Sequence, residues 1–229
     1  MNKPVVLVHG AWHGPWCWDR VTPHLDAAGV PWVAPDLPSC LTASAGSNVT
    51  DDDLAVRRAI DALAGNEQVI LLGHSRGGGV ITESGTHDRV GHLVYLAAFL
   101  GDEDEDATRW ISPGLYSALE SHDDGTTTVR ADMGAEVFYN ECSGKDFAWA
   151  AQQLRPQSHT PLETASQLAW KHKPSTYVVC SRDNAIPAAG QRVMAARSGS
   201  MVEWNTDHSP FANRPELVAA LLIGLSVSS

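Results

Sequence analysis

The sequence contains a serine whose surroundings favour nucleophilic chemistry. The apolar run Val69–Leu72 leads directly into Gly73–Gly77, which reads Gly-His-Ser-Arg-Gly, and small residues follow it. Between a strand and a helix, this motif places its serine on a sharp, strained turn, and the flanking glycines let the two elements pass closely. The N-terminus of the following helix directs free N–H groups towards the serine, where an oxyanion would form. We therefore predict that Ser75 is a nucleophile.

A serine hydroxyl needs a base, and the base needs a carboxylate that fixes its tautomer. On a parallel sheet these groups come from loops at the carboxyl ends of strands, and here they should follow the serine in the order acid, then histidine. Asp183 follows the apolar run Ser175–Cys180, and His208 follows Met201–Trp204. Both have the required position, so we predict a triad of Ser75, Asp183 and His208.

Two other acidic positions are alternatives to Asp183. Asp207 is adjacent to His208 in the chain and cannot easily turn back onto its ring. The acidic run Asp102–Asp106 follows another predicted strand and stays open as a source of the acid. We interpret the run itself as a solvated face and not as a metal site.

An oxyanion hole needs two backbone N–H groups. We assign them to Arg76, which follows the nucleophile, and to Ala11, which lies two residues after His9 at the end of the first predicted strand. Only the backbone of Arg76 is required, and its side chain is expected to be solvated. His9 and His74 are interpreted as structural, whereas His13 is a candidate for the pocket wall.

The elements that would position these residues alternate between strands and helices. Continuous apolar runs predict strands at Val5–Val8 and Val69–Leu72, and further strands are expected at Trp32–Ala34, His92–Ala97, Ser175–Cys180 and Met201–Trp204. Helices are expected after the serine motif and at Pro15–Ala28, Ala188–Arg197 and Pro215–Leu225. Another should run from Thr50 or Asp51 to Ala64, with Leu54, Ile60 and Leu63 facing inward. Repeated strand–helix units imply one mostly parallel, doubly wound sheet of about six strands.

The alternation stops between residues 101 and 168. This stretch opens with the acidic run and then carries scattered aromatic residues, namely Trp110, Tyr116, Phe138, Tyr139, Phe147 and Trp149. We interpret it as a mostly helical insertion that caps the active site, with most of these aromatic side chains in its own core. Residues 1–229 would then form a single domain with a cap at residues 101–168.

Composition limits the classes of partner. The chain of 229 residues is 43% hydrophobic, which is enough for one substantial core. Its formal net charge of −11 argues against nucleic acid or an anionic membrane as a partner. The apolar run after Met1–Pro4 is too short for a secretion signal, and Leu217–Leu225 is too short to span a bilayer. We expect reduced thiols, no metal site and a cytoplasmic location from the spacing of the cysteines, Cys17, Cys40, Cys142 and Cys180.

Segments spread along almost the whole chain also match a known family. They are VVLVHGAWHGPWCW (Val5–Trp18), APDLP (Ala34–Pro38), GHSRGG (Gly73–Gly78), VYLAAF (Val94–Phe99), FYNEC (Phe138–Cys142), LRPQ (Leu154–Gln157), YVVCSRDNAIP (Tyr177–Pro187) and DHSPF (Asp207–Phe211). In these segments the chain resembles α/β-hydrolases of the plant methylesterase and hydroxynitrile-lyase type and their bacterial esterase relatives. The resemblance implies an α/β-hydrolase fold and a cofactor-free enzyme with a small-molecule pocket under a helical cap. It also implies the same triad and the same oxyanion donors.

One departure from the family pattern bears on the reaction. The nitrile lyases of this family carry a lysine directly after the histidine and a threonine in the oxyanion loop, where this chain has Ser209 and Gly10. The lyases need that cationic lysine near the departing cyanide, so its absence here favours the esterase branch.

We therefore expect a serine hydrolase that cleaves a small, largely apolar carboxylic ester or lactone through an acyl-enzyme. Trp12, His13 and Trp16 are candidates for its substrate pocket. Two alternatives stay open: a cofactor-free lyase or carbon–carbon bond-cleaving enzyme on the same triad, and a receptor-like ligand-binding protein with incidental turnover.

Overall fold

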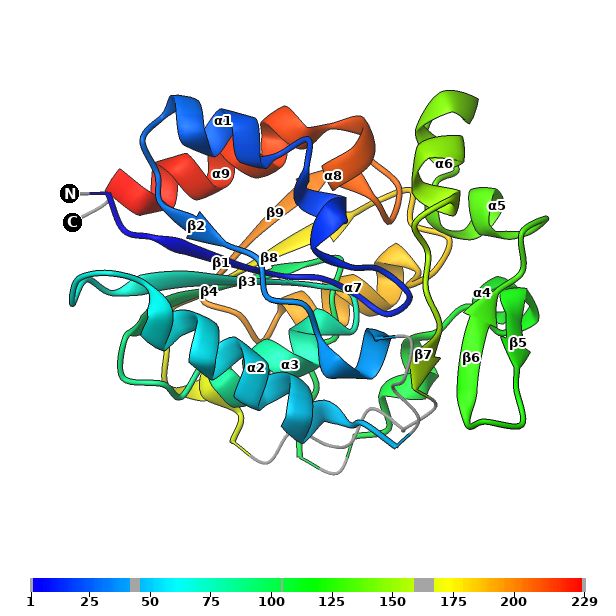
Figure 1. Ribbon diagram of the computed structural model, residues 1–229, viewed down its shortest axis with the longest axis horizontal. Helices are drawn as coiled ribbons and strands as arrows, with labels where there is room; N and C mark the ends of the chain where they lie inside the picture. Colours follow the sequence, from blue (N-terminus) through cyan, green and yellow to red (C-terminus); the bar gives the residue numbers. More distant parts are fainter. Residues whose placement is uncertain (1, 42–45, 104, 159–166, 228–229) are drawn as a thin grey trace.

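The computed structural model describes residues 2–41, 46–103, 105–158 and 167–227. Within them, a six-stranded sheet has the order β2-β1-β3-β4-β8-β9, and every neighbouring pair is parallel (Figure 1). Its strands are β1 (Val5–Val8), β2 (Trp32–Val33), β3 (Val69–His74), β4 (Val90–Leu96), β8 (Ser175–Cys180) and β9 (Ser200–Trp204). The predicted parallel sheet is confirmed.

Helices cover both faces of this sheet (Figure 1). The helices around the sheet are α1 (Thr22–Ala27), α2 (Val49–Ala62), α3 (Gly77–Ser84), α7 (Ala188–Ala195), α8 (Pro210–Asn213) and α9 (Pro215–Val227). Because side chains alternate along a buried strand, Val5 and Leu7 join the apolar layer under α1, α8 and α9, whereas Val6 and Val8 join the layer under α2, α3 and α7. No helix in the described ranges is long and apolar enough to cross a membrane.

The first predicted helix is divided in two. A 3₁₀ turn, η1 (Pro15–Trp18), is followed by the short helix α1, and Pro23 lies in the first turn of α1. A continuous helix from Pro15 to Ala28 would need an N–H group at Pro23 to bond the preceding turn, and proline has none. The expectation of one helix over this range was wrong for that reason.

Helix α2 begins earlier than expected. Its N-cap is Asn48, whose side chain accepts hydrogen bonds from the N–H groups of Thr50 at 2.8 Å and Asp51 at 3.3 Å. The Asp51 carboxylate accepts from the backbone N–H of Asn48 at 3.1 Å, which completes a capping box. Asp51 is therefore a partner of the cap and not the cap itself.

The buried face of α2 also differs from the prediction. Val56 and Ile60 are fully buried, but Leu54 is 45% exposed and Leu63 is only partly buried. Asp52 is buried one turn before Val56. Because the buried face of α2 includes the carboxylate of Asp52, the positions of the apolar residues alone did not predict this face correctly.

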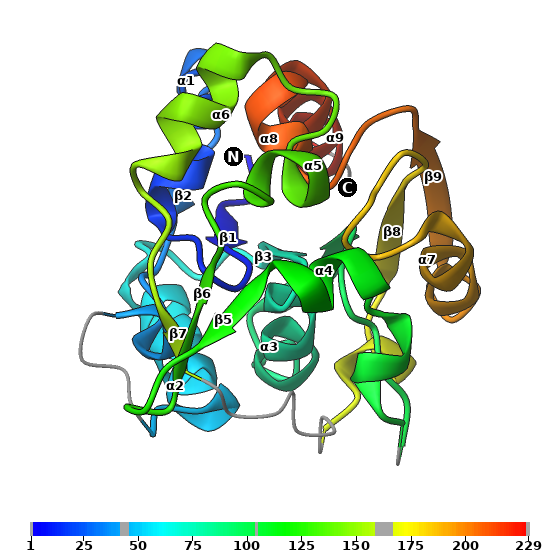
Figure 2. The ribbon, with the colours of Figure 1, turned by 90° about the vertical axis from the view of Figure 1, so that its right-hand side faces the viewer.

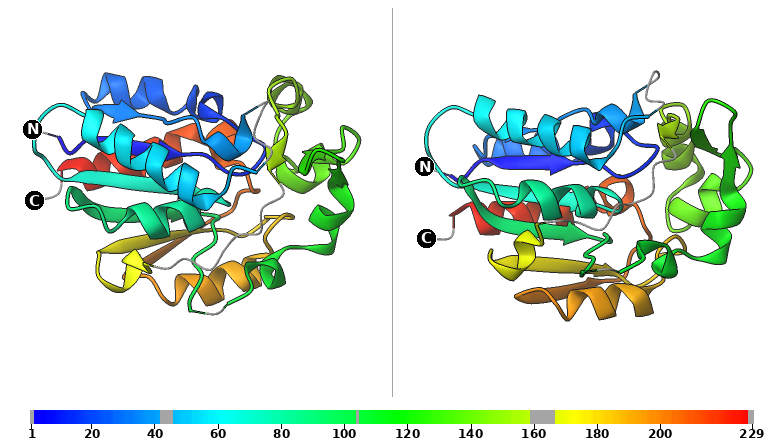
Figure 3. Two further views of the ribbon diagram at one scale, coloured as in Figure 1. Left: turned by 60° about the horizontal axis from the view of Figure 1, so that its bottom comes forward. Right: turned by 90° about the horizontal axis from the view of Figure 1, so that it is seen from below.

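Of the segment between residues 101 and 168, residues 105–158 lie at the carboxyl ends of the strands (Figures 1 and 2), and two further views place them at the same end (Figure 3). It contains helices, but also a three-stranded antiparallel sheet in the order β5-β6-β7, so the expectation of a mostly helical insertion needs this correction. A β-branched run, Thr126–Val129, forms its middle strand. Residue 104 and residues 159–166 lie outside the described ranges. Its elements are η3 (Ala107–Trp110), α4 (Pro113–Ala118), β5 (Leu119–Ser121), β6 (Thr126–Val129), α5 (Gly134–Phe138), α6 (Gly144–Ala151) and β7 (Gln157–Ser158). Two short turns, η2 (Pro38–Cys40) and η4 (Ala169–Lys171), lie outside this segment.

Candidate active site

Ser75 occupies the sharp turn between β3 and α3. Its φ is 52°, a left-handed conformation that is unusual for a residue with a side chain. A Cβ atom on Gly73 would lie 2.5 Å from the carbonyl oxygen of Gly77, and one on Gly77 would lie 2.7 Å from the carbonyl oxygen of His9. Glycine at both positions is thus a steric requirement of the turn that presents Ser75.

Asp183 and His208 come together at the carboxyl ends of β8 and β9. The Nδ1 atom of His208 lies 2.6 Å from Oδ2 of Asp183, and both side chains are buried. Since the carboxylate oxygen only accepts, His208 donates from Nδ1 and its other ring nitrogen is left to act as a base.

The Asp183 carboxylate is itself held in place. Oδ1 accepts from the N–H groups of Ala185 at 2.7 Å and Ile186 at 2.8 Å, and Oδ2 also accepts from Nε2 of Gln191 at 2.8 Å. Gln191 is fully buried in α7. Sequence reasoning missed this residue, and the available signal was a lone amide among the small and apolar residues Gly190, Met194 and Ala195 on the inner face of the helix.

His74 joins the serine turn to the histidine loop. Its Nε2 donates to the backbone carbonyl of His208 at 2.8 Å, and the two ring centroids are 4.7 Å apart. Burial lowers the pKa of His74 well below its ordinary value, so the ring is neutral. Because His74 directly precedes Ser75, this bond ties His208 to the nucleophile turn.

The predicted oxyanion donors lie beside Ser75. A Cβ atom on Gly10 would lie 2.9 Å from Cβ of Ser75, so the loop that carries Ala11 passes directly against the serine. Arg76 is the N-cap of α3. Among the described residues, the backbone N–H groups of Ala11 and Arg76 have no hydrogen-bond acceptor. Two unpaired donors next to a nucleophile suit the stabilisation of an oxyanion.

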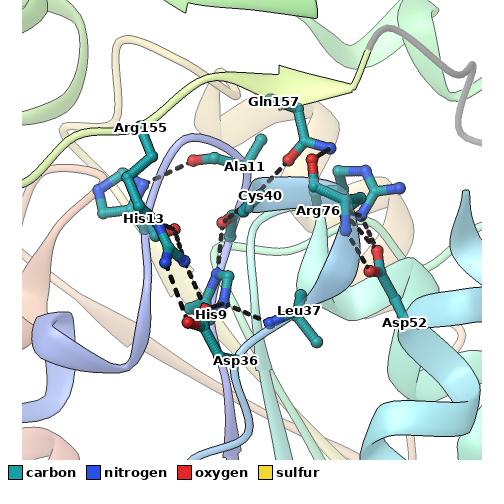
Figure 4. A network of polar contacts seen from close by, with 12 residues as sticks. His9, Ala11, His13, Asp36, Leu37, Cys40, Asp52, Arg76, Arg155 and Gln157 are labelled. Carbon is teal, nitrogen blue, oxygen red and sulfur yellow. Dashed lines mark hydrogen bonds and ion pairs between the residues drawn. The ribbon is translucent and has the colours of Figure 1, made fainter. Parts of the chain in front are cut away.

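The side chain of Arg76 is not solvated, contrary to expectation. Its Nη1 donates to Oδ2 of Asp52 at 2.5 Å and to Oγ of Ser39 at 3.1 Å (Figure 4). Both Arg76 and Asp52 are buried, and Asp52 also accepts from the backbone N–H of Ser39 at 3.0 Å. The charge of Arg76 is therefore used to join α2 to the nucleophile turn.

Of the three candidate pocket residues, Trp12 and His13 directly follow Ala11 in the chain, and Trp16 lies five residues after it. Trp12 is 8% exposed, and His13 is 1% exposed. The ring of His13 stacks on Trp16 with 5.3 Å between centroids, and burial lowers its pKa to about 3. Contact of these side chains with a substrate stays a prediction.

The alternative acids have other partners. Asp207 accepts from the N–H groups of Glu141 at 2.9 Å and Ser209 at 3.0 Å, and no bond joins it to the ring of His208. In the acidic run, Asp102 pairs with Lys171 at 2.8 Å, and Glu105 pairs with Arg197 at 2.5 Å. In the part of the chain that the structure describes, no group of three or more His, Cys, Asp or Glu side chains is arranged to hold a metal ion.

Comparison with known proteins shows the family of the chain. A family model described as the alpha/beta hydrolase family matches residues 5–221. The chain belongs to this family. The match includes every residue assigned to the candidate site of this hydrolase, from Ala11 to His208.

Two relatives of the hydrolase are similar over most of their length. A pyrethroid hydrolase of Sphingobium wenxiniae is 30% identical over 237 residues, which are 94% of this chain and 84% of that protein. A methylesterase of Arabidopsis thaliana, named pFDCC methylesterase, is 27% identical over 249 residues, or 95% and 92% of the two chains. Among solved structures, a pyrethroid hydrolase from Sphingobium faniae has a TM-score of 0.82 and 25% identity, with 99% of this chain and 98% of that chain covered.

Proposed function

We propose that this protein hydrolyses small, largely apolar carboxylic esters or lactones through an acyl-enzyme on Ser75. At the level of reaction class it is a carboxylic ester hydrolase, as its family and its named relatives indicate. The observation that carries the finer proposal is the 2.6 Å hydrogen bond between His208 and Asp183, at the same end of the sheet as the strained Ser75.

In the proposed reaction, Ser75 attacks the ester carbonyl while the free ring nitrogen of His208 takes its proton. Asp183 holds the ring and stabilises the imidazolium that forms. The N–H groups of Ala11 and Arg76 bind the tetrahedral oxyanion. His208 then protonates the leaving alkoxide and activates a water molecule, which releases the acid from Ser75.

The preference for a small, apolar substrate rests on what surrounds the serine. Ser75 is 8% exposed and His208 is 1% exposed, so the site is nearly closed to solvent. The ring of Phe138, from the segment at the carboxyl ends of the strands, lies 5.5 Å from that of His208 and 5.8 Å from Trp12. Apolar groups beside the reacting atoms favour an apolar acyl or alcohol part.

We also propose that residues 101–168 act as a cap over the site. We further propose that the protein is cytoplasmic, because its four cysteines are free thiols.

A series of p-nitrophenyl esters from acetate to octanoate tests the proposal. Wild-type protein should hydrolyse the short or medium chains, and Ser75→Ala should lose about a thousandfold or more of kcat. Ser117→Ala, at an exposed serine of α4, is the matched control and should keep wild-type activity. A fluorophosphonate should phosphonylate the Ser75 hydroxyl with loss of hydrogen fluoride, so that the mass of the phosphonyl group appears on Ser75 in the wild type only. Activity that persists in Ser75→Ala, or a wild type inert to every ester and to the probe, contradicts the proposal and favours the lyase or receptor alternative.

A further inference from the structure

The loop that carries Ala11 is held mainly by the segment that covers the site. Trp12 has a φ of 60°, a conformation that costs energy for a bulky residue and persists only where neighbours enforce it. Its indole N–H donates to Oγ1 of Thr127 on β6 at 3.1 Å. Its carbonyl accepts from the backbone N–H of Arg155, between α6 and β7, at 2.8 Å. Two separate parts of residues 101–168 thus fix the residue next to Ala11.

His13 links the backbone of Ala11 to Tyr139 in the covering segment through its two ring nitrogens. One ring nitrogen, Nδ1, lies 2.6 Å from the carbonyl oxygen of Ala11 (Figure 4), and the other, Nε2, lies 2.7 Å from the hydroxyl of Tyr139. A carbonyl oxygen can only accept, so Nδ1 donates to Ala11 and Nε2 accepts from Tyr139. Because a neutral imidazole has one donor and one acceptor, both partners are satisfied at once.

Arg155 makes further contacts with the same loop. Its Nη2 donates to the carbonyl of His13 at 2.9 Å, and its Nη1 donates to Asp36 at 3.0 Å (Figure 4). The carbonyls of Ala11, Trp12 and His13 therefore each accept a hydrogen bond, whereas the N–H of Ala11 has no acceptor in the described chain. These bonds fix the peptide planes that follow Ala11. The plane that carries the Ala11 N–H also contains the Gly10 carbonyl, which accepts from the backbone N–H of His13 at 3.4 Å, so His13 restrains the loop on both sides of Ala11.

We infer that His13 and Tyr139 are positioning residues that aim the Ala11 N–H at the oxyanion, so that the covering segment sets the oxyanion hole as well as enclosing the substrate. The inference rests on the proposed function, because only an oxyanion gives that N–H a catalytic use. Misplacing a preorganised donor weakens binding of the transition state more than binding of the substrate. The expected signature is a fall in kcat with little change in KM.

The test compares Tyr139→Phe, His13→Ala and the double variant with wild type. Tyr139→Phe removes only the hydroxyl, so it should fold, and its kcat should fall about tenfold with KM within about twofold. His13→Ala should lose about a hundredfold, and the double variant should be no worse than His13→Ala, because the tyrosine acts through the histidine. His13→Asn, whose amide can still donate to Ala11, should recover part of the loss. Tyr116→Phe is the matched control, since Tyr116 is 52% exposed in the same segment.

A second readout separates positioning from general support of the fold. Inactivation by a p-nitrophenyl phosphonate, whose phosphoryl oxygen occupies the same hole, should slow in parallel with kcat across the variants. Wild-type kcat in Tyr139→Phe and His13→Ala, or a raised KM with unchanged kcat, overturns the inference. If the wild type is inactive, or Ser75→Ala stays active, the proposed function itself has failed and the inference fails with it.

Discussion

The guanidinium Nη1 of Arg76 lies 2.5 Å from Oδ2 of Asp52, although 24 residues separate them in the chain. The exposed fractions of the two side chains are 6% and 0%. Removing both charges from water is costly, and a buried pair of this kind is tolerated only with good geometry and further hydrogen bonds, which Ser39 supplies here. The pair connects the first turn of α2 to the residue that follows the nucleophile.

The first prediction concerns this ion pair. Asp52→Asn should lower the free energy of unfolding by about 3–5 kcal/mol, because it leaves the charge of Arg76 buried without a counterion. Urea unfolding followed by circular dichroism measures the change. Asp53→Asn is the matched control: its partner Arg57 is partly exposed, so the loss should stay below about 1 kcal/mol. An equal loss of unfolding free energy in the two variants would show that the buried pair contributes no more to stability than the partly exposed pair.

The second prediction identifies the acid of the triad. Asp183→Asn should lower kcat about ten-thousandfold, because an amide in place of the carboxylate favours the wrong tautomer of His208. Asp102→Asn tests the acidic run and should keep kcat within about twofold of wild type, since that residue pairs with Lys171. Steady-state kinetics on the best p-nitrophenyl ester measures both. An active Asp183→Asn together with an inactive Asp102→Asn would move the acid to the loop after β4.

The third prediction concerns the support of that acid. Besides Asp183, Gln191 bonds the N–H of Cys180 at 2.9 Å and the carbonyl of Ile186 at 2.7 Å. Gln191→Met keeps the shape but leaves these buried groups unpaired, so unfolding should become easier by about 1–3 kcal/mol. The kcat should fall about tenfold with KM retained, a smaller loss than for Asp183→Asn. Gln152→Met, at an exposed glutamine after α6, should change neither quantity, and a Gln191 variant that behaves like it would remove Gln191 from the site.

Local patterns predicted the elements that carry the site. The strands β1, β3 and β8 carry mostly apolar and β-branched residues and are buried along their whole length, and the glycines around Ser75 are the ones that the turn requires sterically. Because the carboxyl ends of parallel strands meet at one edge of the sheet, the proximity of Asp183 and His208 could be predicted before any contact between them was known. These features depend on sequence neighbours or on the general geometry of a parallel sheet.

Contacts between distant elements could not be predicted in the same way. A charged residue is usually solvated, and the separation of Arg76 and Asp52 along the chain gives no indication that they form an ion pair. The roles of Tyr139 and Thr127 depend on how residues 101–168 fold back over the loop after β1. That path depends on an antiparallel sheet of very short strands, for which the threonine-rich run at β6 was the available sign.

The last prediction concerns acid stability and follows from two buried histidines. The pKa of His13 is lowered by burial from 6.5 to about 3, and burial also lowers the pKa of His74. Above pH 6.5 both rings are neutral in the folded and unfolded states, so their neutral burial carries no pH-dependent cost. As the pH falls below 6.5, the unfolded chain takes up protons that the folded protein excludes, and this loss continues for His13 down to about pH 3. The free energy of unfolding should therefore decrease on acidification, with a slope that approaches about 1.4 kcal/mol per pH unit for each histidine.

Urea unfolding at pH 7, 6 and 5 measures this slope. His13→Asn removes one of the two titrating rings while keeping a donor for Ala11, so its slope should be shallower than that of wild type by about one histidine's share. The comparison is made between slopes because the variant also loses the bond to Tyr139, which lowers stability at every pH by a constant amount. A slope in His13→Asn that equals the wild-type slope would mean that His13 takes up its proton in the folded protein over the same pH range as in the unfolded chain. In that case Nε2 would donate to the hydroxyl of Tyr139 instead of accepting from it, whereas Nδ1 would still donate to the carbonyl of Ala11.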